Sequence, residues 1–272
     1  MSDCTHDCSS CSANCSDRKP TKEDFLKPMN KYSNIKKVIG VVSGKGGVGK
    51  SLVTCMLAAK CAKAGLKVGV LDADITGPSV PKSFGIKTRA MQDDECLLPT
   101  VADGVKVMSI NLLLEDENSP VVWRGPVISG VIEQFWSDVR WGELVYLFVD
   151  MRPGKGDVAL TVFQSLPVDG VIIVSTPQDL VKMIVSKAVN MANMMDVPVL
   201  GIVENMSYFE CPDCGKRHAV FGDSKVDETA EEFGVPVLAK LPINPAVNRL
   251  VDAGRIFDAP DNELDEFVEA LK

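Results

Sequence analysis

The run GKGGVGKS, from Gly44 to Ser51, has the residue types and spacing of a phosphate-binding loop. It meets every fixed position of the pattern G-x-x-x-x-G-K-S/T, after a short β-branched run and before a segment with helical spacing. Its glycines let several backbone N–H groups point at one phosphate, and the following helix N-terminus favours negative charge. The sequence therefore predicts an ATP and Mg²⁺ site, with Lys50 on the β- and γ-phosphates and the Ser51 hydroxyl on Mg²⁺. We expect the nucleotide to contact the whole loop: Gly44, Lys45, Gly46, Gly47, Val48, Gly49, Lys50 and Ser51.

Three aspartates stand where two apolar runs end. Asp72 and Asp74 follow one run, and Asp150 ends the run from Leu144. Carboxylates at strand ends facing the phosphates are placed to hold Mg²⁺, its waters or the attacking water. We expect Asp150 to bind magnesium, Asp72 to support the metal and Asp74 to position the water, as a catalytic residue beside Lys50. An aspartate in such a place can also be only a helix cap or a turn former.

A second pair of candidate ligands is the CxxC motif formed by Cys211 and Cys214. Two thiolates are too few for a closed tetrahedral site. A symmetric homodimer would supply four, enough for one 4Fe–4S cluster on its two-fold axis. The spacing alone also suits a redox pair or half of a zinc site.

Four further cysteines form the pattern C-x3-C-x2-C-x3-C near the N-terminus: Cys4, Cys8, Cys11 and Cys15. In a helix these offsets would place all four sulfurs on one face. They suit a second iron–sulfur site or zinc, and a cluster-delivery or unligated tail is a further alternative. Residues 1–34 have few aliphatic side chains, so we expect a flexible segment that orders only around a metal centre. Residues 35–272 are then the ATPase domain.

Apolar runs alternate with amphipathic segments from residue 36 onward. The runs predict strands at 38–43, 67–72, 105–110, 144–150, 171–175, 197–204 and 235–241. Helices are expected at 51–64, 126–139, 157–165, 180–195, 225–233 and 262–271. This alternation predicts an α/β fold, a mostly parallel sheet with helices on both faces, whose ligands bind beyond the carboxyl ends of the strands.

Composition and charge narrow the functional classes. The chain is 46% hydrophobic and carries a formal net charge of −8. That acidity argues against a general nucleic-acid surface and against docking to an anionic membrane. No apolar run reaches the length of a membrane span and no signal peptide is visible, so we expect a cytoplasmic protein. In that reducing compartment the nine cysteines are not expected to form structural disulfides.

Several segments together resemble one known family. They are the P-loop with its early Lys45, the run DADITGPS from Asp72, WRGP from Trp123, DMRPGKGD from Asp150, VENM from Val203, and CPDCG from Cys211. Over residues 36–272 they resemble the Mrp/ApbC iron–sulfur cluster carrier ATPases, whose P-loop is the deviant Walker A type of MinD and ParA. The resemblance implies a nucleotide-sandwiched homodimer, an iron–sulfur cluster as cargo and apo-proteins as clients. It implies that Lys45 reaches the partner's ATP and that Asn205 recognises adenine; without it, Lys45 would be read as a solvated surface lysine.

The chain departs from that family pattern after Asp150. Arg152 replaces the first of two paired prolines and Lys155 replaces a threonine, next to the expected γ-phosphate. We therefore expect weak or altered ATP hydrolysis, and a regulatory protein that has lost hydrolysis is one alternative. A positioning ATPase and an electron-transfer ATPase are others. The first would need a membrane or DNA surface that this acidic chain does not suggest, and the second would take its cluster ligands from separated segments.

Overall fold

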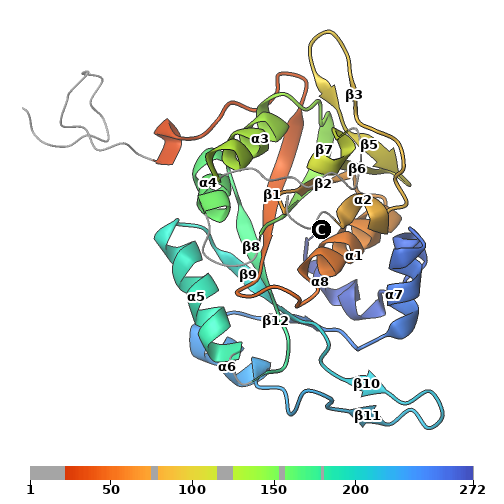
Figure 1. Ribbon diagram of the computed structural model, residues 1–272. Coiled ribbons are helices and arrows are strands. Elements are labelled where there is room, and N and C mark those ends of the chain that lie inside the picture. The colour runs from red at the N-terminus through yellow and green to blue at the C-terminus, as the bar shows by residue number, and fades with distance from the viewer. Residues whose placement is uncertain (1–21, 75–78, 115–124, 153–156, 179–180, 272) are drawn as a thin grey trace, which may run out of the picture.

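The computed structural model describes residues 22–74, 79–114, 125–152, 157–178 and 181–271, and within them eight strands form one central sheet (Figure 1). The strand order is β12-β9-β8-β1-β7-β2-β6-β5, and every neighbouring pair is parallel except β5 and β6. The strands are β1 (Asn34–Val42), β2 (Val68–Asp72), β5 (Thr100–Ala102), β6 (Val105–Ser109), β7 (Glu143–Asp150), β8 (Gly170–Ser175), β9 (Val199–Glu204) and β12 (Val237–Lys240).

Helices cover both faces of this sheet (Figure 1). One apolar cluster joins the sheet to α1 (Lys50–Lys63), α2 (Val80–Ser83), α7 (Pro245–Asp252) and α8 (Asp265–Leu271). A second joins the opposite face to α3 (Gly125–Ser137), α4 (Asp157–Ser165), α5 (Val181–Met194) and α6 (Val226–Phe233). The central strands lie between two apolar layers, which is why their sequences read as continuous apolar runs.

Short elements complete the chain. Two antiparallel pairs lie outside the main sheet, β3 (Met91–Gln92) with β4 (Leu97–Leu98) and β10 (Phe209–Glu210) with β11 (Arg217–His218). Single 3-10 turns occur at Lys22–Asp24, Ile110–Leu112, Ile256–Asp258 and Asn262–Leu264. None of the helices in the described ranges has the length and apolar character that crossing a bilayer requires.

The α/β class with a mostly parallel sheet is confirmed, and the seven strands expected from the sequence all form. The antiparallel edge strand β5, the β10–β11 hairpin and the helices α2 and α7 were not expected. Each is short, and α2 and α7 each contain a proline in the first turn, so their sequences resemble loops more than helices.

The N-terminal segment is partly attached to the domain. Lys27 donates its backbone N–H to Ser165 O at 2.9 Å and accepts at its carbonyl from Trp136 Nε1 at 3.0 Å. Asn30 is buried and donates to Ser137 O at 3.1 Å. These backbone, indole and amide hydrogen bonds join this part of the segment to α3 and α4, while the flexible segment of residues 1–34 stays a prediction. Cys4, Cys8, Cys11 and Cys15 lie outside the described residues.

Candidate functional site

The loop from Gly44 to Gly49 connects the end of β1 to the first residue of α1, as the motif requires. Gly47 and Gly49 adopt φ of +79° and +80°, in the left-handed region that side chains rarely occupy. A methyl group on Gly49 would meet Asn205 Nδ2 at 2.2 Å, so this position also lacks space. The loop lines a cavity of about 340 Å³ together with Asp74 and Ser79. The glycine loop and the first residues of α1 line this cavity, and a loop of this kind before a helix N-terminus suits a phosphate.

Lys50 and Asp150 form an ion pair at the base of the loop. Lys50 Nζ lies 2.5 Å from Asp150 Oδ1, and both side chains are buried. The Ser51 hydroxyl donates to Asp150 Oδ2 at 2.5 Å and the Thr54 hydroxyl to Oδ1 at 3.1 Å. Asp150 thus accepts from three donors in the first five residues of α1. The sequence reasoning missed Thr54, although its place one turn after Lys50 puts both on one face of the helix.

Asp72 lies beside Asp150, because β2 and β7 are neighbours and these two residues are paired in register. Its carboxylate accepts the Ser109 hydroxyl at 3.0 Å and the Asp74 backbone N–H at 3.1 Å. Burial, reinforced by the negative charge of Asp150, raises the pKa of the Asp72 carboxyl well above its ordinary value. Because it accepts the backbone N–H of Asp74, Asp72 also acts as a turn former for the residues that follow it. Ser109, another residue that the sequence did not single out, ends the strand next to β2.

Together, Ser51, Asp72 and Asp150 present oxygen atoms at the carboxyl edge of the sheet, below the phosphate cavity. Magnesium prefers such ligands and is commonly held by one or two carboxylates and a hydroxyl beside substrate phosphates. The donor set therefore fits Mg²⁺.

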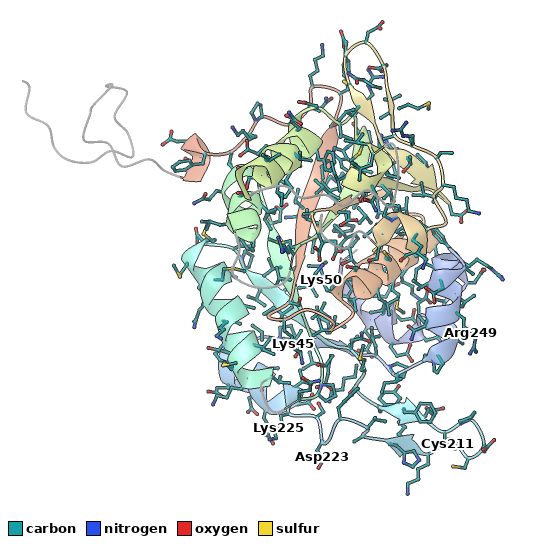
Figure 2. All side chains as sticks on the ribbon, in the orientation of Figure 1. Lys45, Lys50, Cys211, Asp223, Lys225 and Arg249 are labelled. Atoms are coloured by element: carbon teal, nitrogen blue, oxygen red, sulfur yellow. The ribbon has the colours of Figure 1, made fainter. Side chains whose placement is uncertain are left out.

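Lys45 extends from the loop toward the end of β8, where its ammonium group donates to Gln178 Oε1. Figure 2 shows Lys45 and Lys50 on the two sides of the loop, so their ammonium groups have different neighbours. Arg152 follows β7 and is exposed. Lys155 lies outside the described residues.

A second hollow adjoins the P-loop on the side of β9. Asn205, at the end of β9, is buried and donates its side-chain amide to Val48 O at 2.9 Å. It lines a cavity of about 200 Å³ with Leu52, Phe221, Pro242 and Val247. Its walls are mostly apolar, with Asn244, Asn248 and Glu263 as further polar residues, and such a surround suits a flat heteroaromatic ring with polar edges. The expected base-recognition residue is thus connected directly to the loop that faces the phosphates.

Cys211 and Cys214 lie in the turn of the β10–β11 hairpin, which extends from the body of the domain (Figures 1 and 2). Cys211 donates its N–H to Lys216 O at 3.0 Å, Gly215 donates to Cys211 O at 2.9 Å, and Gly215 has a φ of +68°. The backbone N–H groups of Asp213 and Cys214 lower the pKa of the Cys211 thiol. Cys214 is exposed and Cys211 partly so. This knuckle presents two thiols outward and favours a thiolate ligand, so it fits half of a shared metal or cluster site.

The structure separates the two sites. The nucleotide residues gather at the carboxyl edge of the sheet, whereas the cysteine pair lies at the end of the hairpin (Figure 2). Within the described residues, no group of three or more His, Cys, Asp or Glu side chains could hold a metal ion. A cluster at Cys211 and Cys214 would therefore need ligands from outside the described residues.

Several known proteins are similar to this chain. A family model described as ParA: NUBPL iron-transfer P-loop NTPase matches residues 34–272. An iron-sulfur cluster carrier protein of Methanocaldococcus jannaschii is 45% identical over 93% of this chain and 90% of its own length. One from Clostridium perfringens is 51% identical over 82% of each chain. Among solved structures, an Archaeoglobus fulgidus nucleotide-binding protein in complex with ADP is 46% identical, with a TM-score of 0.76 over 84% of this chain and 90% of that one. The cell-division ATPase MinD of Pyrococcus furiosus, 19% identical with a TM-score of 0.62 over 87% of this chain and 97% of that one, shares the fold.

Proposed function

This chain belongs to the family of NUBPL iron-transfer P-loop NTPases, and from that premise we propose that it is an ATP-dependent iron–sulfur cluster carrier. The observation that carries the proposal is the exposed CxxC knuckle in the same chain as a complete P-loop site. Two chains would bind one 4Fe–4S cluster through four thiolates and pass it to apo-proteins. The matching family model spans residues 34–272 and so includes both the P-loop and the CxxC knuckle.

The residues of the P-loop site have distinct roles in this proposal. The loop N–H groups and Lys50 hold the phosphates of ATP, while Ser51 and Asp150, with Asp72 behind them, hold Mg²⁺. Bound magnesium neutralises charge that develops on the phosphates during transfer to water. Asp74, at the rim of the same cavity, orients the attacking water. Lys45 reaches across the homodimer to the partner's phosphates, and Asn205 recognises the adenine ring.

Hydrolysis is slow in this proposal because of the segment after Asp150. Arg152 and Lys155 add two cations near the γ-phosphate, and the threonine hydroxyl expected in the family is lost. Arg152→Pro with Lys155→Thr should raise ATP turnover, measured as phosphate release at saturating ATP. An unchanged rate would remove this explanation.

The carrier would act in the cytoplasm, without binding nucleic acid or membrane.

Anaerobic reconstitution with iron and sulfide tests the carrier function. The background is a variant with serine at Cys4, Cys8, Cys11 and Cys15, so that only the knuckle is measured. We expect about two iron atoms per chain and a dimer in sedimentation analysis, since one cluster is shared by two chains. Cys211→Ser with Cys214→Ser should abolish iron and sulfide binding. Cys96→Ala, at a buried thiol, is the matched control and should retain both.

Transfer is tested by mixing the loaded dimer with an apo-ferredoxin and following the acceptor's spectrum. Full iron binding by the double knuckle variant would contradict the assignment of the site. Normal binding with no transfer in the presence of ATP would contradict the carrier function and favour a protein that only stores a cluster.

A further inference from the structure

The cysteine pair is carried by one excursion of the chain, residues 206–224, which leaves the sheet after β9 and returns at α6. Figure 2 shows Cys211 on the hairpin, Asp223 on the return path and Lys225 at the start of α6. We call residues 206–224 the cysteine excursion. Where the thiols lie relative to the domain depends on how the two ends of this excursion are held.

Both ends are held by one carboxylate. Glu204, the last residue of β9, is fully buried. The Ser207 hydroxyl, at the outgoing end, donates to its Oε2 at 2.6 Å. The Ser224 hydroxyl, at the returning end, donates to its Oε1 at 2.9 Å. Hydrogen bonds to a buried charged group are among the stronger ones, and losing a donor leaves that charge incompletely satisfied.

The same excursion lines the cavity beside the P-loop. Met206 and Phe221 belong to its wall, together with Asn205, whose side-chain amide is bonded to Val48 O. A ring bound in this cavity would therefore contact the P-loop side and the cysteine excursion at once. Residues near both ends of the excursion would thus contact the same ligand.

Backbone hydrogen bonds join the outgoing end to a second wall of that cavity. Leu241 donates to Glu204 O at 2.8 Å, Ser207 donates to Leu241 O at 2.8 Å, and Ile243 donates to Tyr208 O at 2.7 Å. Leu241 and Ile243 also line the cavity. Movement of this wall on ligand binding would be transmitted to the start of the hairpin.

The first residue of the excursion is conformationally strained. Met206 has a φ of +57°, a left-handed conformation that costs a non-glycine residue free energy. Such a residue persists where its neighbours are fixed, and here Asn205 N–H bonds Ser175 O at 2.8 Å while Ser207 is held by Leu241 and Glu204. The junction between the base cavity and the cysteine excursion is therefore held in one specific conformation.

We propose that Glu204 is a positioning residue that couples occupation of the cavity beside the P-loop to the order of the cysteine excursion. It does so by fixing both ends of the excursion to the end of β9, directly before Asn205. The proposal rests on the proposed function for its purpose, because it explains how a bound nucleotide changes the presentation of Cys211 and Cys214. Its physical content does not require a cluster.

Hydrogen–deuterium exchange of peptides within residues 206–224 tests the coupling in the full-length, cluster-free chain, with and without saturating ADP and Mg²⁺. In the wild type we expect ADP to slow exchange by about fivefold, as for a modest coupling between two sites. Ser224→Ala, which releases the returning end, should reduce the effect to within about twofold. Ser224→Thr keeps the hydroxyl and should retain it.

Ser165→Ala is the matched control, because it removes a hydroxyl-to-glutamate hydrogen bond of the same 2.9 Å length, to Glu133, between α4 and α3 and outside the cysteine excursion. It should leave the ADP effect unchanged. Glu204→Leu removes both hydrogen bonds and should abolish the ADP effect. If that variant does not fold, the comparison of Ser224→Ala with Ser224→Thr still tests the proposal.

Two outcomes would overturn the proposal: no ADP-dependent protection in the wild type, or full protection in Ser224→Ala at saturating ADP. Because no cluster is present, this result is independent of reconstitution. A chain that couples but binds no cluster would refute only the carrier function, and one that binds a cluster without coupling would refute only the role of Glu204.

Discussion

The ion pair between Lys50 and Asp150 predicts a measurable cost of removing either charge. Their side chains are 5% and 1% exposed, and Nζ lies 2.5 Å from Oδ1. Removing one member of a buried pair typically destabilises a protein by roughly 3–5 kcal/mol, because the remaining charge is left unpaired. Asp150→Asn keeps the shape and still offers an oxygen to the Ser51 hydroxyl. We therefore expect the lower end of that range, about 3 kcal/mol.

Urea unfolding measured without nucleotide gives this free energy, and a double-mutant cycle isolates the pair. Lys50→Met should also destabilise the domain, because it leaves the adjacent carboxylates without their cation. The double variant should be destabilised by less than the sum of the two, with an interaction energy of about 2 kcal/mol. The exposed pair Arg255–Asp258 provides the control, and Asp258→Asn should cost under about 1 kcal/mol.

Additive costs, within about 0.5 kcal/mol, would refute the reasoning, because they would mean that the two charges do not interact in the folded chain. An Asp150→Asn cost no larger than that of Asp258→Asn would do the same. Either result would also weaken the assignment of Asp150 as the ion-pair partner of Lys50 in the nucleotide-free site.

Three other predictions follow from the site. Burial places the folded pKa of Asp72 above its unfolded value, so ionisation above about pH 4 weakens the folded state. Asp72→Asn should therefore raise the thermal unfolding midpoint of the nucleotide-free protein at pH 7. The increase should become smaller toward pH 4. A lower midpoint at pH 7 would contradict this prediction. Gly49→Ala should weaken ADP binding in calorimetry by about tenfold or more, because the added methyl displaces Asn205 and strains a left-handed residue; unchanged affinity would count against the cavity as the nucleotide site. Backbone N–H donors lower the pKa of Cys211, so iodoacetamide should alkylate it faster at pH 7 in the folded chain than in urea, as quantified by peptide mass spectrometry. Equal rates would show that the knuckle does not activate this thiol.

The sequence predicted the elements that carry the nucleotide site because their signals are local. A β-branched run, a glycine loop and a helical segment follow one another from Val38 to Lys63 and need no distant partner to be recognised. The expected boundaries of the long elements agree with the structure within a few residues. Short elements such as α2 and α7 were missed, since four to eight residues with a proline in the first turn give little periodicity.

The hydrogen bonds of residues 27–33 to the domain were not expected, for a different physical reason. Residues 27–33 look like a polar linker, because their attachment comes from a backbone carbonyl, a backbone N–H and the side chain of Asn30. Their partners on α3 and α4 are more than a hundred residues away in the chain. Composition describes the capacity of a segment to bury apolar surface, and it does not describe such hydrogen bonds.

The sequence by itself determined the family, the P-loop and the identity of the residues that could bind phosphate, magnesium and a cluster. Motif spacing is sufficient for this, because each motif reflects what a short stretch of backbone can do. Only the tertiary structure decided which distant groups meet. It placed Asp72 opposite Asp150, Asn205 on the P-loop, and Ser207 and Ser224 on one buried carboxylate. These contacts depend on strand order and on the packing of both sheet faces, which no local pattern specifies.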